Sequence, residues 1–198
     1  MSNRTVGVHF DGDLRSVLIA QAAEDIATHG IEGFSLRDLA RQVGVSHAAP
    51  AHHFGDRTGL LTAIATVGFE RFAGYLADAL ATIATDEPDE LFPALAAAYV
   101  TFADQERGFF DVMFQPGLLR SDDVRFAAAG AAAFEALRGA IAACQRRGWR
   151  AGSDPQRVAA AAWAFAHGLA MLHRQGSLQR HFGTGSPSDV AALAAELV

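Results

Sequence analysis

The chain has 198 residues, of which 51% are hydrophobic, and its net charge is −6. Its length is enough for one or two domains with a real core, and its acidic balance argues against the broad basic surface typical of nucleic-acid binders. The single Cys144 excludes an intramolecular disulfide, the runs of alternating β-branched residues expected of strands are missing, and we find no apolar run of ~20 residues that could span a membrane. We therefore expect a soluble, cytoplasmic, all-α protein.

Two helices are predicted first. Asp13 is a good N-cap for a helix over residues 14–28, whose apolar side chains recur at helical spacing. Gly30 suits the left-handed position that closes such a helix. Ser35 is expected to cap a second helix over 36–43, with an acidic residue three positions later as in a capping box.

A third helix is expected after a tight turn at Gly44. Ser46 is the predicted N-cap, which places Pro50 at the fourth helical position, at the edge of the zone where proline is tolerated. We expect the proline ring to face inward and the helix to be short and slightly distorted. Two helices joined by a tight glycine-containing turn are typical of a helix-turn-helix.

The stretch FSLRDLARQVGVSHAAPAHHFGDRTGLL, residues 34–61, resembles the DNA-binding domain of the TetR family of bacterial transcriptional repressors. The similar features are LRDLA, GVS, the His-Phe pair at 53–54 and a basic residue shortly before Leu-Leu. GDLR at 12–15 is typical of one branch of that family, and WAFAHGL at 163–169 resembles that branch's Trp-His-Gly signature. The resemblance implies a helix-turn-helix domain over 1–61 and a ligand-binding and dimerisation domain over 62–198.

The resemblance also implies which residues would touch DNA. The N-terminal part of a recognition helix faces base edges in the major groove, so we expect base contacts from His47, Ala48, Ala49 and Ala51. The family usually has a DNA-contacting Tyr where this chain has Ala51. Arg37 matches a family position that can reach guanine. Phosphate contacts are expected from Ser35, Ser46, His52, His53, Arg57 and Thr58.

Simpler interpretations of these residues stay open. Residues 1–61 hold five arginines and seven acidic residues, so DNA binding would depend on the placement of few charges. Arg37 could pair with Asp38, and Arg57 could merely lie solvated at the start of the fourth helix. A metal site at the histidines is not expected, because no cysteine joins them and the three side chains cannot share one helix face. Arg4, in the arm before the first helix, could reach the minor groove.

The remaining chain reads as a series of amphipathic or apolar helices. Prolines 88, 155 and 187 suit the first turn of a helix. The predicted helices cover residues 59–84, 88–106, 108–114, 121–147, 155–175 and 187–197.

Two clusters indicate a chamber for a small hydrophobic ligand. The segment RGFFDVMF contributes Phe109, Phe110, Met113 and Phe114, and WAFAHGLAML places Trp163, His167 and Met171 on one helix face. Phe102 and Phe134 are weaker candidates. Such stripes also occur as ordinary core, and both interpretations stay open.

The last two long helices are rich in alanine, at Ala159–Ala162 and Ala191–Ala195. In the TetR family such helices form a four-helix dimer interface, which implies a homodimer that fits a palindromic operator. Cys144 is expected to be a packed thiol rather than a redox sensor. The sequence thus predicts a repressor without a cofactor, released from DNA by a small hydrophobic ligand.

Two other functions are weighed against it. The first is an effector-independent regulator or activator whose C-terminal domain only dimerises. The second is an all-α enzyme, for which we find no HExxH, P-loop, GxSxG or paired Glu-x-x-His pattern. No catalytic residue is predicted.

Overall fold

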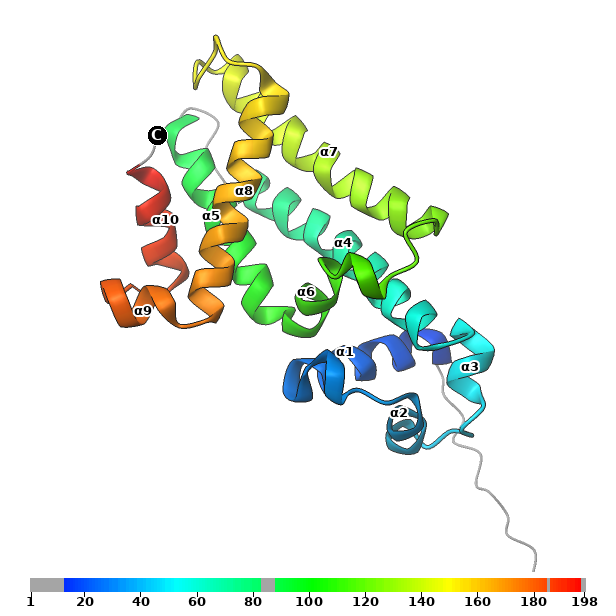
Figure 1. The fold of residues 1–198 in the computed structure, drawn as a ribbon. Helices are drawn as coiled ribbons and strands as arrows, with labels where there is room; N and C mark the ends of the chain where they lie inside the picture. Colours follow the sequence, from blue (N-terminus) through cyan, green and yellow to red (C-terminus); the bar gives the residue numbers. More distant parts are fainter. Residues whose placement is uncertain (1–12, 83–87, 185, 197–198) are drawn as a thin grey trace, which may run out of the picture. The chain divides into compact units, whose positions relative to one another are not determined.

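The computed structural model describes residues 13–82, 88–184 and 186–196, and within these ranges the regular structure is entirely helical, as predicted. Figure 1 shows the order of the helices along the chain. They are α1 (Leu14–Gly33), α2 (Leu36–Val43), α3 (Ala49–Phe54), α4 (Arg57–Thr82), α5 (Pro88–Gln105), α6 (Arg107–Met113), the 3₁₀ turn η1 (Pro116–Leu118), α7 (Val124–Arg146), α8 (Pro155–Arg174), α9 (Ser177–Phe182) and α10 (Pro187–Ala195).

Local capping explains where several helices begin. The Asp13 carboxylate accepts the Arg15 N–H at 3.1 Å, and the Ser35 hydroxyl accepts the Asp38 N–H at 3.4 Å, so both predicted caps are confirmed. Asp123 accepts two N–H groups from the first turn of α7. This cap makes α7 begin at Val124 rather than at the predicted residue 121.

The predicted helices differ from the observed ones at a few places. Helix α1 continues to Gly33 across a kink at Gly30, whose φ of 76° is positive but whose ψ of 165° lies outside the left-handed helical region. The short helix α9 was not predicted. Helix α4 begins at Arg57, two residues before the prediction, and the predicted ends at residues 84 and 197 lie outside the described residues.

The chain divides into two compact units. In the described residues, unit 1 comprises 13–68 and 107–127, and unit 2 comprises 69–106 and 128–196 without the gaps. Unit 1 therefore contains α6, which follows α5 in the chain but packs against α1. The sequence-based boundary after residue 61 stays a prediction, whereas packing assigns α6 and the segment after it to the N-terminal helices.

Within unit 1, α1 and α6 approach each other at backbone distance. Leu18, Ile26 and Leu39 are fully buried in the core of this unit. A Cβ atom added to Gly108 of α6 would lie 1.9 Å from the carbonyl oxygen of Ala23 in α1. Only a residue without a side chain allows this contact, so Gly108 sets the spacing of the two helices.

Within unit 2, helix α5 packs against both α8 and α10 (Figure 1). Phe102 of α5 is almost fully buried, and its ring lies 5.1 Å from that of Phe72. Cys144 of α7 is also buried, and its thiol donates a hydrogen bond to the Ala140 carbonyl at 3.0 Å. Burial raises the pKa of Cys144 to about 11, so the group stays a neutral, packed thiol, as expected from the sequence.

Among the described helices, α7 alone is long and apolar enough to cross a membrane by length and composition. It has 23 residues, and its most apolar window has a mean hydropathy of 1.3. Charged residues interrupt α7, so it contains no unbroken apolar run of the length that a span needs. Core helices of soluble proteins meet the same criteria, so α7 receives no membrane assignment.

Candidate functional site

The turn between α2 and α3 is built by Gly44. This residue adopts the left-handed conformation with φ 77° and ψ 27°, and its N–H bonds to the carbonyls of Ala40 and Arg41. The Val45 N–H then donates to the Ala40 carbonyl at 2.9 Å. These bonds end α2 and turn the chain so that α3 packs beside it, which is the helix-turn-helix arrangement predicted from the sequence.

The third helix begins later than predicted. Its N-cap is Ala48, without a side-chain cap bond, and the expected cap Ser46 lies in the preceding turn, where its carbonyl accepts the Ala49 N–H. This start makes Pro50 the second helical residue, where no N–H is needed. In the predicted register its ring would clash with the carbonyl four residues earlier. The proline is buried, as predicted, while His47 and Ala48 lie in the turn.

The predicted DNA-contacting residues are mostly accessible. The exposed members are Arg37, Ser46, His47, Ala48, Ala51 and His52, and the half-buried ones are Ser35, Ala49, His53, Arg57 and Thr58. The Asp38 carboxylate pairs with Arg41 at 2.8 Å, so it is not the partner of Arg37. Within the described residues, Arg37 makes no ion pair, which leaves its guanidinium available. Arg4 lies outside the described residues.

Arg57 has a structural bond that the sequence pattern did not predict. Its guanidinium donates to the carbonyl of Ile31, in the last turn of α1. The side chain therefore fixes the end of α1, and with it the entry into α2, from the start of α4. The predicted phosphate contact of Arg57 stays a prediction, because a guanidinium has five N–H donors and this bond uses one.

A second unpredicted contact fixes the turn between α3 and α4. Arg120, from the segment between η1 and α7, donates to the Asp56 carboxylate at 2.9 Å and through its N–H to the Thr62 hydroxyl at 3.0 Å. Asp56 also accepts the Gly59 N–H at 2.8 Å. The Gly59 N–H and the Arg120 guanidinium lower the pKa of Asp56. No local sequence signal predicts this pair, because its members lie 64 positions apart.

The first predicted ligand cluster belongs to unit 1. Phe109, Phe110 and Met113 are buried in the unit that holds α1, and a Cβ added to Gly68 of α4 would lie 2.6 Å from the Met113 sulfur. Phe114 packs on Phe110 with ring centroids 5.5 Å apart. Met113 and Phe114 also line a pocket of about 270 Å³. Most of this cluster is therefore helix-packing core, while its role in ligand binding stays a prediction.

The second cluster lies in unit 2 and is held by Tyr99. The Trp163 indole N–H donates to the Tyr99 hydroxyl at 3.3 Å, and that hydroxyl lies 2.9 Å from Nδ1 of His167. Burial lowers the pKa of His167, so the imidazole is neutral and its Nδ1 can accept the Tyr99 O–H. The cavity lined by Tyr99 and Trp163 holds only about 10 Å³.

The other predicted lining residues are spread over unit 2. Phe134 lies edge-on to Trp163 at 4.9 Å but is 43% exposed, and Met171 is 39% exposed. Phe102 is sealed in the core. The nine predicted ligand residues thus fall into two different units, and those in unit 2 surround a nearly filled interior.

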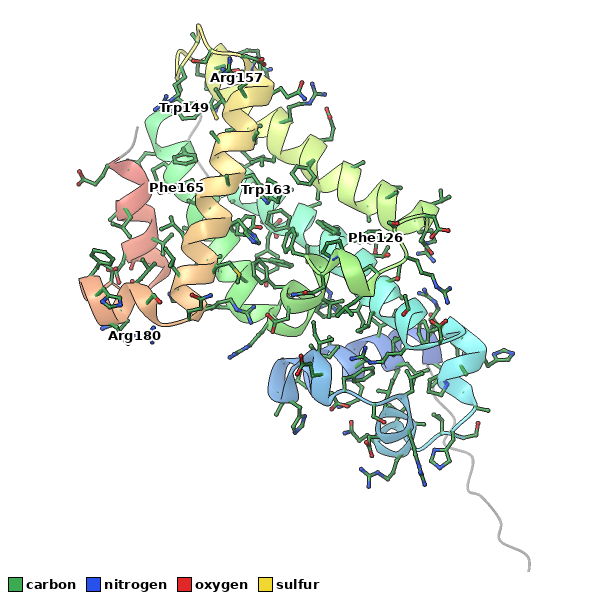
Figure 2. The ribbon with its side chains drawn as sticks, viewed as in Figure 1. Phe126, Trp149, Arg157, Trp163, Phe165 and Arg180 are labelled. Atoms are coloured by element: carbon green, nitrogen blue, oxygen red, sulfur yellow. The ribbon has the colours of Figure 1, made fainter. Side chains whose placement is uncertain are left out.

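A larger pocket of about 580 Å³ lies elsewhere in unit 2, at the start of α8. Phe92 of α5 and Trp149 of the α7–α8 turn contribute to its wall, and Figure 2 labels Trp149, Arg157 and Phe165. The sequence pattern assigns no role to these residues, because the aromatic members are far apart in the chain. The lining comprises Phe92, Trp149, Arg150, Ser153, Asp154, Arg157, Val158, Ala161, Ala162 and Phe165.

Comparisons with known proteins place these features in context. Residues 18–64 match the model of bacterial regulatory proteins of the tetR family, and residues 92–198 match that of the tetracyclin repressor-like C-terminal domain. No curated protein sequence matches significantly.

Several solved structures are similar over nearly the whole chain. A protein of unknown function from Rhodococcus sp. RHA1 is 33% identical, with 96% of each chain covered and a TM-score of 0.81. The TetR family transcriptional regulator PfmR from Thermus thermophilus is 24% identical, with 94% of each covered and a TM-score of 0.61. AibR, solved in complex with isovaleryl coenzyme A and operator DNA, is 18% identical, with 94% of this chain and 98% of AibR covered and a TM-score of 0.66.

Proposed function

Because this chain belongs to the TetR family of bacterial transcriptional regulators, we propose that it is a homodimeric repressor that binds a palindromic operator and is released by a small ligand. The observation that carries this proposal is the helix-turn-helix of unit 1. Its second helix is short and starts with exposed residues beside the exposed Arg37. We infer that the protein acts in the cytoplasm, where operator DNA is found.

Recognition of DNA would be divided between these residues. His47 and the methyl groups of Ala48 and Ala51 are exposed at the start of α3, and this position suits the base edges of the major groove. Few polar groups are present there, so Arg37 would supply the strongest base contact. The proposed interface therefore needs no broad basic surface, which agrees with the net charge of −6.

A homodimer through α8 and α10 is supported by the solvent-facing side of α8. Ala160 and Ala164 are exposed and Gly168 is half-buried, and these three small residues recur every four positions along the helix. Met171 and Leu172 continue this side with 39% and 44% of their surface exposed. Small residues allow close helix packing, and the two-fold symmetry of a dimer would match an inverted repeat in the operator.

Ligand release would require a molecule with different affinities for the DNA-binding and released conformers. Unit 2 offers a pocket of about 580 Å³, which lies within the usual range of about 300–1,000 Å³ for small-molecule sites. The similar protein AibR was solved in complex with isovaleryl coenzyme A, a molecule that combines a short acyl chain with anionic groups. Both observations support a small, partly hydrophobic effector.

The proposal is tested by capturing genomic DNA of the source organism with the purified protein at physiological salt and sequencing what is retained. We expect a few fragments that share an inverted repeat. Refolding the protein from denaturant before capture removes a co-purified ligand. A retained pool without a common sequence, also after refolding, would contradict operator recognition.

We predict that Arg37→Ala relaxes sequence preference at one base pair of each half-site. A bidentate arginine–guanine contact contributes about 1–3 kcal/mol of discrimination, so the preference for guanine should fall roughly 5- to 150-fold. Fluorescence anisotropy with operators substituted at each position measures this change.

Arg41→Ala provides the matched control, because it removes the same charge from the same helix. Arg41 is paired with Asp38 on the surface, so we expect its loss to leave the ranking of operator variants unchanged. Equal changes in ranking for both variants would show that Arg37 contributes only charge.

A regulator without an effector is the alternative. In that case the C-terminal unit would only dimerise, and no small molecule would change operator affinity. The family is one of regulators, and the described residues show no reason to assign an enzyme activity.

A further inference from the structure

We propose that the pocket at the N-terminal end of α8 binds a small apolar carboxylate, whose carboxylate is held by the indole N–H of Trp149 and the guanidinium of Arg157. This inference rests on the ligand response proposed above, and it names the site and chemical class of the ligand. Apolar contacts would come from Phe92 and Phe165, whose rings lie 5.7 Å apart.

The Trp149 indole N–H provides the first argument. Only 7% of the Trp149 surface is exposed, and its Nε1 is buried without a hydrogen-bond partner. An indole N–H can only donate, and a buried donor without an acceptor destabilises the folded protein. Trp149 also lines the pocket, so an oxygen atom of a bound ligand would supply the missing acceptor.

The Trp149 ring is held in place by two neighbours. It stacks on Phe92 with centroids 6.0 Å apart and an interplanar angle of 20°. The guanidinium carbon of Arg150 lies 5.6 Å from the centroid of the indole. A ring fixed in this way presents its N–H in one direction, as a binding site requires.

The turn that carries Trp149 is strained and well braced. Arg150 has a φ of 44°, and it is the one residue other than glycine with a positive φ in the described chain. The Gln145 side chain donates to the carbonyls of Arg150 at 3.2 Å and Ser153 at 2.9 Å. Such conformations persist where the surroundings enforce them and cluster at functional sites.

The charges around the pocket favour an anion. Arg150 and Arg157 contribute two positive charges, and Asp154 contributes one negative charge. The Asp154 carboxylate is already engaged as the N-cap of α8, where it accepts the Gln156 N–H at 2.9 Å. In the described part of the chain Arg157 has no ion-pair partner, and it is exposed. A single carboxylate would therefore balance the local charge.

The nearby interior site is unsuited to the same ligand. The cavity beside Trp163 holds about 10 Å³, whereas the pocket beside Trp149 holds about 580 Å³. Phe92 and Ala162 border both spaces, so occupation of the larger one can be felt by the Tyr99–Trp163–His167 cluster. The two tryptophans thus report on the two spaces separately.

The test uses 4-phenylbutyrate as the probe and its amide as the uncharged control. The full-length protein is labelled with ¹⁵N at indole nitrogen, which gives one N–H resonance for each of the two tryptophans. Trp149→Phe assigns the Trp149 resonance. We expect the acid to shift this resonance in a saturable way, because its N–H gains an acceptor, and the amide to bind at least about tenfold more weakly.

Two variants locate the carboxylate. Arg157→Gln should weaken binding of the acid about tenfold or more and leave binding of the amide unchanged. Arg125→Gln removes the same charge from an exposed position outside the pocket and should leave both affinities unchanged. An unmoved Trp149 resonance at millimolar 4-phenylbutyrate, or an affinity insensitive to Arg157→Gln, would overturn the proposal.

A second readout separates this inference from the proposed function. The affinity of the protein for its captured operator is measured with and without saturating 4-phenylbutyrate. A Trp149 shift with unchanged operator affinity supports the pocket and contradicts release by this ligand. Release from the operator without a Trp149 shift supports ligand response and overturns the pocket.

Discussion

Gly108→Ala is expected to destabilise the protein by about 2–3 kcal/mol and to abolish operator binding. The added Cβ would lie 1.9 Å from the Ala23 carbonyl oxygen and 2.6 Å from its carbonyl carbon. Both atoms are backbone, so no side-chain rotation relieves the overlap and α6 must move away from α1. Because α1 supports the helix-turn-helix, a displaced α1 would misplace the proposed DNA contacts. Urea denaturation at a fixed protein concentration measures the loss.

Gly74→Ala is the matched control. Gly74 lies within α4, and a Cβ added there meets no atom within 4 Å. Alanine in a helix interior is more stable than glycine by roughly 0.5–1 kcal/mol, so this variant should gain stability and keep operator affinity. If Gly108→Ala were as stable as Gly74→Ala, the close α1–α6 contact would be incorrect.

Tyr99→Phe is expected to cost about 2 kcal/mol or more in the free energy of unfolding. The hydroxyl accepts from Trp163 and bonds to His167, so its removal breaks two hydrogen bonds in a largely buried cluster. Burial also raises the pKa of Tyr99 well above its usual value, in agreement with a neutral hydroxyl. The measurement is a denaturation midpoint at unchanged m-value, at a pH above about 7 where His167 is neutral.

Tyr75→Phe removes a similar hydroxyl from a more exposed place. That hydroxyl donates to the Gln105 side chain at 2.8 Å, and water can replace it in the variant. We expect a change within about 0.5 kcal/mol. Losses of equal size in the two variants would show that the Tyr99 cluster contributes no more than a surface contact.

The pH dependence follows from His167. Its pKa in the folded protein lies below the usual value of 6.5 because burial disfavours the charged imidazolium. Its contribution to stability is therefore complete above about pH 6.5 and is lost as the pH falls through the lowered pKa. Tyr99→Phe should be closer to the wild-type protein in stability under acidic conditions than under neutral ones.

Several features could be predicted from sequence because they depend on neighbouring residues. Asp13 and Ser35 cap helices through bonds to N–H groups two or three residues away, and Gly44 ends α2 by its own left-handed conformation. Helical periodicity then placed most of the helices close to their observed bounds. Together these local signals were enough for the helix-turn-helix and for the family.

The start of α3 shows where local signals compete. Ser46 is a favourable cap, but a helix that begins there would place Pro50 against a backbone carbonyl. The steric demand of the proline prevailed, and the helix began at Ala49. The preference was present in the sequence, and the relative strength of the two signals decided the outcome.

The sequence by itself determined an all-α TetR-family regulator, because caps, turns and periodicity act over a few residues. Only the tertiary structure decided that Arg120 holds Asp56, that Gly108 touches the α1 backbone, and that Trp149 and Phe92 enclose a pocket. These contacts join residues more than fifty positions apart. Such pairings depend on how helices pack, and packing is set by the shapes of all side chains in the core rather than by any short stretch of sequence.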